Sequence, residues 1–520
     1  MKKKYIIGVD IGGTNTDAVV VDNDNQIIAC KKTTTTDSIE EGFTTVLKEV
    51  LNLSQRPVQE ISGVFVGTTH ATNALLQKKG LYRVGVLRLT SMTGNCLPPC
   101  YAWPADMREA IFAGHVSVAG GYECDGRLIN GIDEGEIAKA IQYLQGQGMQ
   151  GLAIVGVFSP LNHEQELQAK SIAEKILGAD FPLTLSHKIG GVGIINRENA
   201  TILNVCLKKT MKNGFNALKA AMNSLGLNCA LHLTQNNGTI LPLEDALEFP
   251  VLTISAGPTN SFIGSAKISG LTDAVVVDIG GTSTDVGLVV NGLPRRSVDS
   301  SSIGGVSLNF PMPDVLSIAL GGGSYIDMKN SDDIHIGPLS CGKDLKKEAI
   351  SFGGNRLTLT DIAVSLDLID LGTEKIKQPP LRADQADQVL KLAAAKIEDL
   401  TRIMAGVHKD LPIILTGGGS AIFKNIQSED KTYLIPANAG VANAYGAALA
   451  EISGSVDTVV CLEQREATLS QLQDEAMAKA IALGAQKDTL RMVELEIVPY
   501  HYLPQNLARV KITVAGKRNF

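Results

Sequence analysis

Short apolar runs rich in β-branched residues stand on either side of two glycine-containing turns. The four runs are Tyr5–Val9, Ala18–Val21, Ala274–Val277 and Val286–Val290. Runs of this length and composition predict strands, and the few residues between the runs of each pair leave room only for a tight turn. The pattern therefore predicts two strand–turn–strand units, one near the start of the chain and one past its middle.

The two turns have nearly the same sequence. Asp10–Asp17 and Asp278–Asp285 are identical at seven of eight positions, and 268 residues separate them. In each copy the glycines lead from one strand into another, whereas the glycines of a P-loop or a dinucleotide-binding turn open a helix. Two ordinary glycine hairpins are the alternative, but two near-identical copies favour a duplicated phosphate-binding loop.

Both turns carry groups that suit a phosphate chain, because glycines let backbone N–H groups approach an anion and hydroxyls add donors. The predicted phosphate-binding residues are Gly12, Gly13, Thr14, Asn15 and Thr16 in the first copy and Gly280, Gly281, Thr282, Ser283 and Thr284 in the second. Asp10 and Asp278 end the first strand of each copy, where a carboxylate can hold Mg²⁺ through water. Asp17 and Asp285 are candidates for a base or a supporting role, with bracing of the hairpin as the alternative.

A third glycine loop follows a third apolar run. Leu411–Thr416 predicts a buried strand, and Gly417, Gly418 and Gly419 come directly after it. Consecutive glycines allow close approach to a flat ligand such as adenosine, while a plain strand-to-helix connection is the alternative. We expect this loop to border an adenosine because it follows both phosphate loops in the chain.

The remaining pattern predicts a division into lobes. We expect a first lobe over residues 1–185, with an insertion at about 91–135 that is rich in Pro and Gly and contains Trp103. A second lobe is expected over residues 186–460. A C-terminal helix and strands over residues 461–520 are expected to pack on the lobes.

Composition narrows the class of protein. The chain has 520 residues, 44% of them hydrophobic and 19% charged, with 47 Lys and Arg against 54 Asp and Glu. A net charge of −7 argues against a globally basic nucleic-acid binder, and the apolar content argues against disorder. No apolar run reaches the roughly 18 residues of a membrane span, and no signal-peptide pattern opens the chain. The sequence therefore predicts a cytoplasmic protein with neither nucleic acid nor membrane as a partner.

The eight cysteines are scattered along the chain. One close group stands out, Cys96, Cys100 and Cys124, and these three cysteines can be interpreted as zinc ligands. Pro98 and Pro99 separate the first two, and no regular second pair follows. Reduced thiols without a metal are the favoured interpretation.

The order of the three loops, two for phosphate and then one for adenosine, resembles the superfamily of actin, Hsp70 and the sugar kinases. This resemblance implies an α/β protein with a two-lobed actin-like ATPase fold, built on duplicated RNase H-like mixed sheets. It also implies a nucleotide cleft between the lobes, with ATP and Mg²⁺ as cofactors.

A narrower resemblance rests on several short segments. Gly67–Leu76 closely resembles the GTT-x-ATNALL segment of the hydantoinase A and 5-oxoprolinase family. Gln235–Gly238 is similar to its Q-S-N-G segment, Ser255–Ala266 to its S-G-P…GA segment, and Gly321–Ser324 to its glycine run. The segments occur in family order over about residues 4–450.

What the family resemblance implies is an ATP-dependent hydrolase. Family members use ATP to open a five-membered cyclic amide, or to activate a carbonyl in related carboxylases. A lactam carbonyl is a poor electrophile, and phosphorylation of its oxygen would make its carbon open to attack by water. A cyclic amide or related carbonyl compound is thus the expected substrate. A small-molecule kinase of the same fold and a non-catalytic, ATP-switched partner subunit are the alternatives.

The segment after the strand at residues 63–66 supplies the candidate substrate residues. Thr68, Thr69, Thr72 and Asn73 can face the cleft, or they can cap the following helix and bond its backbone. His70 is a candidate general base, with a purely structural role as the alternative.

The chain departs from the family pattern in two places. Leu316 stands where a family histidine would fall, which would remove a metal or substrate contact, and Cys341–Lys347 replaces a D-P-G-P-A-C-Y-G stretch. Full-length oxoprolinases also carry a B-type portion, so the resemblance raises a separate B-type partner subunit as an expectation. We further expect a homo-oligomer.

Overall fold

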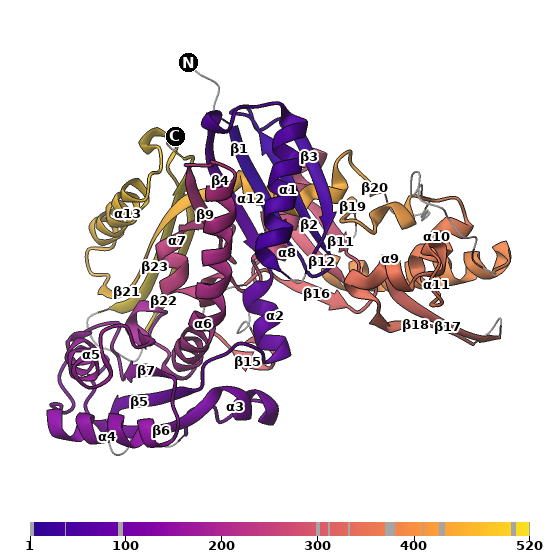
Figure 1. Cartoon of the computed structure of the whole chain (residues 1–520). Coiled ribbons are helices and arrows are strands. Elements are labelled where there is room, and N and C mark those ends of the chain that lie inside the picture. Colours follow the sequence, from indigo (N-terminus) through magenta and orange to yellow (C-terminus); the bar gives the residue numbers. More distant parts are fainter. Residues whose placement is uncertain are drawn as a thin grey trace.

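Two large mixed sheets and one small parallel sheet make up the protein (Figure 1). The computed structural model describes residues 5–36, 38–91, 97–297, 302–309, 312–330, 333–369, 379, 381–408, 410–425, 432–500 and 506–518.

The first large sheet has nine strands in the order β22-β23-β21-β10-β9-β4-β1-β2-β3. β1 pairs antiparallel with β2 and parallel with β4, so a hairpin starts the sheet and a parallel strand continues it. The bounds are β1 (Tyr5–Ile11), β2 (Asn15–Val21), β3 (Ile27–Thr34), β4 (Ile61–Thr68), β9 (Ala230–Thr234), β10 (Thr239–Pro242), β21 (Glu451–Cys461), β22 (Arg491–Pro499) and β23 (Leu507–Gly516).

The second large sheet repeats this start. β11 pairs antiparallel with β12 and parallel with β19. Its strands are β11 (Ala274–Ile279), β12 (Thr284–Val290), β13 (Leu293–Pro294), β16 (Val315–Ile318), β19 (Ile413–Thr416) and β20 (Tyr433–Leu434). The expected α/β fold with two lobes on duplicated mixed sheets is confirmed.

Both faces of the first sheet are buried, and successive side chains along a strand point into opposite cores. Ile7 and Val9 lie in a core with residues of α1 and α6, whereas Ile6 lies in a second core with residues of α12 and α13. This is the period-two pattern of a strand covered on both faces. The covering helices are α1 (Ile39–Ser54), α6 (Ile194–Ser224), α7 (Leu243–Glu248), α12 (Ala442–Leu449) and α13 (Arg465–Ala482).

Helix α8 (Ala256–Ser269) crosses α12 between the two large sheets. A Cβ atom at Gly446 would lie 1.9 Å from the backbone oxygen of Asn260, and one at Gly264 would lie 2.0 Å from that of Ala442. The two backbones therefore touch, and only glycine permits this crossing. On its other side α8 packs Phe262 and Ala266 against the second sheet, so the α8–α12 pair joins the lobes.

The far face of the second sheet is covered by α10 (Leu359–Ser365) and α11 (Ala383–Ala405). Two hairpins and three short helices lie outside the three main sheets. These are β14 (Ser302–Ile303) with β15 (Val306–Ser307), β17 (Ser324–Asn330) with β18 (Asp333–Ser340), α2 (His70–Gln77), α3 (Ala105–Ile111) and α9 (Leu345–Glu348).

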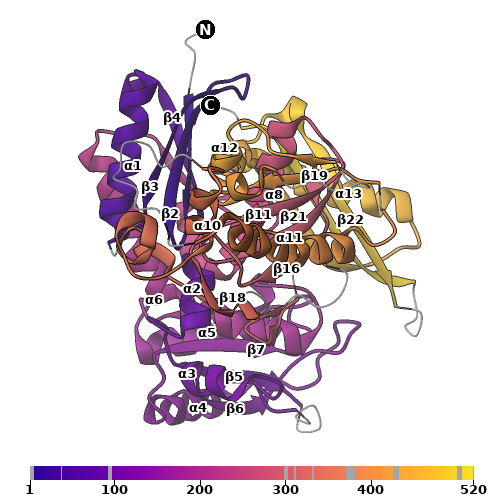
Figure 2. The ribbon, with the colours of Figure 1, turned by 90° about the vertical axis from the view of Figure 1, so that its right-hand side faces the viewer.

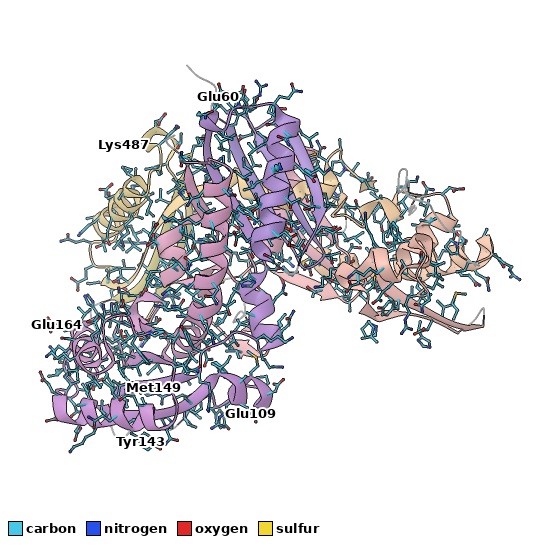
Figure 3. All side chains as sticks on the ribbon, in the orientation of Figure 1. Glu60, Glu109, Tyr143, Met149, Glu164 and Lys487 are labelled. Atoms are coloured by element: carbon cyan, nitrogen blue, oxygen red, sulfur yellow. The ribbon has the colours of Figure 1, made fainter. Side chains whose placement is uncertain are left out.

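The small sheet has the order β6-β5-β7-β8, with every pairing parallel. Figure 2 shows it as a separate layer below the large sheets, and in Figure 3 the labelled Glu109 and Tyr143 mark it at the end opposite Glu60. Its elements are β5 (Val84–Thr90), β6 (Phe112–Ala119), α4 (Glu134–Gly146), β7 (Gly151–Gly156), α5 (Glu164–Leu177) and β8 (Leu183–Leu185).

The sheets do not follow the segments expected from sequence. β9 and β10 come after residue 186 yet belong to the sheet of β1, as do the C-terminal strands β21 to β23. Residues 84–185 instead build the small sheet, which takes β6 from the expected insertion. The first large sheet therefore takes strands from both sides of the expected boundary at residues 185 and 186, because long-range parallel pairing returns β9 to β4.

Candidate functional site

The two predicted phosphate turns have the same geometry. Gly12 N donates to Asn15 O at 3.0 Å, and Gly280 N donates to Ser283 O at 2.9 Å. Asp10 faces Asp17 across the first hairpin, and Asp278 faces Asp285 across the second. The sequence repeat is thus also a structural repeat.

The two turns lie against each other. A Cβ atom at Gly281 would lie 2.8 Å from Thr14 Oγ1. Between them is a cavity of about 160 Å³, which Lys32 and Asn443 also line. The predicted site residues that line it are Asp10, Gly12, Gly13, Thr14, Asn15, Asp17, Thr69, Asp278, Gly280, Gly281, Thr282, Ser283, Asp285, Gly417 and Gly418.

Thr16 and Thr284 are buried behind the turns. Thr16 Oγ1 lies 3.1 Å from Thr35 Oγ1, and Thr284 Oγ1 donates to Leu320 O at 2.6 Å. The geometry gives these two hydroxyls a role in bracing the loops, although the sequence suggested them as phosphate donors.

Burial dominates the electrostatics of the four carboxyl groups. It raises the pKa of Asp10 to about 8, with further contributions from the charges of Asp17 and Asp278. It raises the pKa of Asp285 to about 6 and also raises that of Asp278. Four acids in one desolvated cleft therefore favour a cation or a proton beside them.

Lys32 is a site residue that sequence reasoning missed. Its Nζ donates to Asp17 Oδ2 at 2.5 Å and opposes the rise that burial causes in the pKa of Asp17. Lys32 stands directly opposite Asp17 in the β2–β3 pairing. A count outward from the turn at residues 22–25 sets Asp17 against Cys30. An irregularity in the pairing at Val20 and Val21 moves the partner on to Lys32, so the sequence pattern does not reveal it.

Asn443 is the second residue missed. It lies in the first turn of α12, and its Nδ2 donates to Asp278 Oδ2 at 3.4 Å. No local sequence signal marks it, since α12 follows the third glycine loop by many residues and reaches the site only through the α8–α12 crossing.

The acidic side chains suit a hydrated cation. Asp10 Oδ1 and Asp17 Oδ1 are buried and lack a hydrogen-bond partner among the described residues. Over the same residues no group of three or more His, Cys, Asp or Glu side chains could hold a metal by direct ligation. This combination fits Mg²⁺ that keeps most of its water and is bound through one or two carboxylates and a phosphate chain.

The third glycine loop reaches the same cleft. Gly417 has φ +82°, and a Cβ atom there would lie 2.2 Å from Asp278 Oδ1. Gly417 and Gly418 line the cavity, while Gly419 N donates to Ile279 O at 2.7 Å and packs on the end of β11. The glycine run at residues 321–323 supports the second turn, because Gly322 N donates to Gly280 O at 3.0 Å.

Most of the candidate substrate residues make hydrogen bonds within the protein. Thr68 Oγ1 accepts from His70 N at 3.0 Å, and Asn73 Nδ2 donates to Thr69 Oγ1 at 3.1 Å. Thr72 Oγ1 accepts from Ser255 N at 3.3 Å. Thr69 lines the cavity, whereas His70 is partly buried away from it, and burial lowers its pKa.

The positions that depart from the family pattern serve packing. Leu316 packs against the core of the second lobe, and the neighbouring Ser317 donates to Asp285 Oδ1. Cys341 is buried and contacts Gly323 O. Of the cysteines considered for zinc, Cys96 lies outside the described residues, and Cys100 is a buried thiol whose pKa burial raises.

Two mixed sheets that begin with the same glycine hairpin, with the two turns against each other, define the two-lobed actin-like class of proteins. Comparison with known families narrows this class. The hydantoinase/oxoprolinase N-terminal region matches residues 6–177, and the hydantoinase/oxoprolinase domain matches residues 197–405. The chain belongs to the hydantoinase/oxoprolinase family.

Curated relatives include enzymes and enzyme subunits. The caprolactamase subunit alpha of Pseudomonas jessenii is 25% identical over 92% of this chain and 76% of the relative. The 5-oxoprolinase 1 of Arabidopsis thaliana is 24% identical over 64% of this chain and 28% of that protein. The acetone carboxylase beta subunit of Xanthobacter autotrophicus is 23% identical over 66% and 51%.

Two solved structures share the whole fold. A nucleotide-free acetone carboxylase, from a study of ATP-dependent acetone carboxylation, has a TM-score of 0.76 and 17% identity, covering 100% of this chain and 88% of that chain. The ATP-dependent caprolactamase of Pseudomonas jessenii has a TM-score of 0.75 and 21% identity, covering 98% and 87%. No helix within the described part of the chain is long and apolar enough to cross a membrane.

Proposed function

We propose that this chain is an ATP-dependent hydrolase that opens a cyclic amide by phosphorylation of its carbonyl oxygen. The observation that supports this most is the pair of facing phosphate turns, with four buried acids and Lys32 around one cavity. Membership of a family of ATP-dependent hydantoinase- and oxoprolinase-like enzymes supports the reaction class.

The residues have distinct proposed roles. Backbone N–H groups of the turns at residues 12–16 and 280–284 hold the phosphates, and Gly417 and Gly418 border the adenosine. Asp10 and Asp278 position Mg²⁺ through water. In phosphoryl transfer the protein mainly positions groups and neutralises charge, which is what these loops can do.

When bound, ATP supplies the phosphoryl group that makes the amide carbonyl open to attack by water. Thr69, which lines the cavity, is placed to orient the carbonyl compound. Asp17 and Asp285 flank the Mg²⁺-positioning acids, and each is a candidate to accept the proton of the attacking water. His70 is a weaker candidate because it lies away from the cavity.

Several finer features stay predictions from the sequence. They are the B-type partner subunit, the homo-oligomer and the cytoplasmic location. The names of two relatives support a partner subunit, since one is the alpha subunit of a caprolactamase and the other is the beta subunit of an acetone carboxylase.

Phosphate release and product analysis test this function together. The purified chain is incubated with Mg-ATP and with 5-oxoproline, hydantoin, caprolactam or acetone. Stimulated phosphate release with an opened ring supports the hydrolase. A parallel incubation uses small sugars and polyols, and transfer of phosphate to one of their hydroxyl groups without release would establish the kinase alternative instead.

A further inference from the structure

A second and much larger cavity lies outside the nucleotide site. Its volume is about 1130 Å³. It is bounded by the start of α6, the loop after β9, and strands β22 and β23, which Figure 1 shows beside α6 and above the small sheet. The Gln235–Gly238 segment, which the proposed function leaves without a role, contributes three residues to its wall.

A glycine-rich loop, Gly190–Gly193, leads into α6 at this cavity. Behind the loop the fully buried Arg197 donates from Nη1 to Gly191 O at 2.8 Å and to Val192 O at 2.7 Å. A trans peptide places its N–H opposite its C=O. The N–H groups of Val192 and Gly193 therefore point away from Arg197.

The start of α6 adds further donors. The helix has 31 residues, and its N-cap is Gly193, which has no side chain to satisfy the first N–H groups. These groups and the helix dipole make a helix N-terminus favourable for an anion. A glycine loop that opens such a helix is a recurrent arrangement for binding oxyanions.

Two side-chain amides beside this loop have no partner in the described structure. Asn236 is 6% exposed, and its Nδ2 lacks an acceptor. Its backbone is held firmly, because its N–H donates to Leu252 O at 3.0 Å and its oxygen accepts from Thr259 Oγ1 at 2.8 Å. An unpaired buried amide is costly, so its retention on a cavity wall points to a ligand.

Asn309 is the second such amide. Its Nδ2 and Oδ1 are both buried without a partner among the described residues. A Cβ atom at Gly190 would lie 1.8 Å from Asn309 Nδ2, so the amide packs directly on the glycine loop. The absence of a Cβ atom at Gly190 is what admits this amide.

The charged groups around the cavity are mostly paired. A Cβ atom at Gly191 would lie 2.8 Å from Arg509 Nε, so that guanidinium lies against the loop. Arg509 makes a two-point bond to Asp457, and its Nη1 is 3.8 Å from Glu496 Oε2. An incoming anion could replace this long contact without disturbing the bond to Asp457. Leu308 supplies apolar wall, which suits an organic ligand.

We propose that this cavity binds a small organic oxyanion, either a carboxylate or a phosphate ester. Its charged group is held by the Gly190–Gly193 loop, the first turn of α6 and the amides of Asn236 and Asn309. The site is separate from the nucleotide cavity, and binding there requires neither ATP nor its turnover.

Titration calorimetry on the full chain without nucleotide tests the site. Glutarate and inorganic phosphate are the two probes, each at constant ionic strength. We expect Asn236→Ala and Asn309→Ala each to weaken binding of at least one probe by about tenfold, as loss of a hydrogen bond to a charged group does. Both variants should keep the wild-type melting temperature, because the unpaired amide groups make no hydrogen bond with the described residues that the substitutions could remove.

A control variant separates this site from other anion binding. Asn223→Ala removes an exposed amide at the far end of α6 and should bind both probes as the wild type does. Any phosphate binding at the turns of the nucleotide cavity is the same in all variants. Only a loss of affinity that is specific to the two amide variants therefore supports the proposed site. Weakening for glutarate identifies a carboxylate ligand, and weakening for phosphate identifies a phosphate ester. Unchanged affinity for both probes, or no binding by the wild type, would overturn the proposal.

Discussion

Lys32 offers the sharpest test of the charge arrangement in the cavity that we propose holds the nucleotide. It is the cation among the described residues that line the cavity, against the four acids Asp10, Asp17, Asp278 and Asp285. Lys32→Met keeps the length of the side chain and removes the charge. We expect turnover of Mg-ATP to fall sharply while the fold persists.

The two effects differ in size. Lys32 Nζ is 2.5 Å from Asp17 Oδ2, but the lysine side chain is 33% exposed, so solvent screening limits the loss of folding free energy to about 1 kcal/mol. In the proposed function Lys32 is a preorganised charge in the cavity that holds the phosphates, and removing such a charge costs on the order of 10²-fold to 10³-fold in kcat. The melting temperature should therefore drop by only a few degrees, while kcat drops by at least about a hundredfold.

Steady-state ATP turnover and thermal unfolding measure the two effects separately. Lys31→Met is the matched control, because Lys31 neighbours Lys32 and makes a surface ion pair with Glu49 at 3.0 Å. Lys32→Arg should restore part of the activity, since it keeps the charge. Equal turnover in the Lys32→Met and Lys31→Met variants would refute the idea that the charge of Lys32 supports phosphoryl transfer.

Two further predictions concern stability. Burial gives the carboxyl group of Asp10 a folded pKa of about 8 against an ordinary value of 3.8, so the folded state binds its proton more tightly than the unfolded state does. Its contribution to stability is present below about pH 4 and is lost as pH rises toward 8. Urea unfolding of the metal-free protein should therefore show the wild type losing stability relative to Asp10→Asn between pH 5 and pH 8, and a constant difference would contradict the shift. Gly446→Ala should cost about 1–3 kcal/mol or more by forcing α8 and α12 apart. Gly146→Ala is the control, because a Cβ atom there meets nothing within 4 Å, and its free energy of unfolding should lie within about 0.5 kcal/mol of the wild-type value. A Gly446→Ala variant as stable as this control would disprove the close crossing.

The core of the site could be predicted because it is built from local sequence. Each of the two repeated glycine turns is a continuous segment, and the repeat with strands on either side predicted both hairpins. The third glycine loop was found for the same reason. These features depend on residues within a few positions of one another, where turn chemistry and strand pattern decide the structure.

The missed features depend on contacts between distant segments. Asn443 reaches Asp278 only because α12 crosses α8, and the sequence near residue 443 does not predict that crossing. The first sheet crosses the expected lobe boundary because β9 returns to β4 after the 31 residues of α6, and because β21 to β23 extend that sheet. Parallel pairing between remote strands has no local sequence signal. Lys32 lies on the neighbouring strand, but the irregular pairing at Val20 and Val21 means that a regular count along the hairpin does not set it against Asp17.

The central claim is that this chain couples ATP to the opening of a cyclic amide. Phosphate release from Mg-ATP, measured with and without 5-oxoproline, hydantoin and caprolactam, tests that claim most directly. We predict that one of these compounds stimulates release and appears as its ring-opened product, and that Asp10→Ala abolishes the stimulation. Bound ATP without stimulation by any cyclic amide, or equal turnover in Asp10→Ala, would contradict the claim.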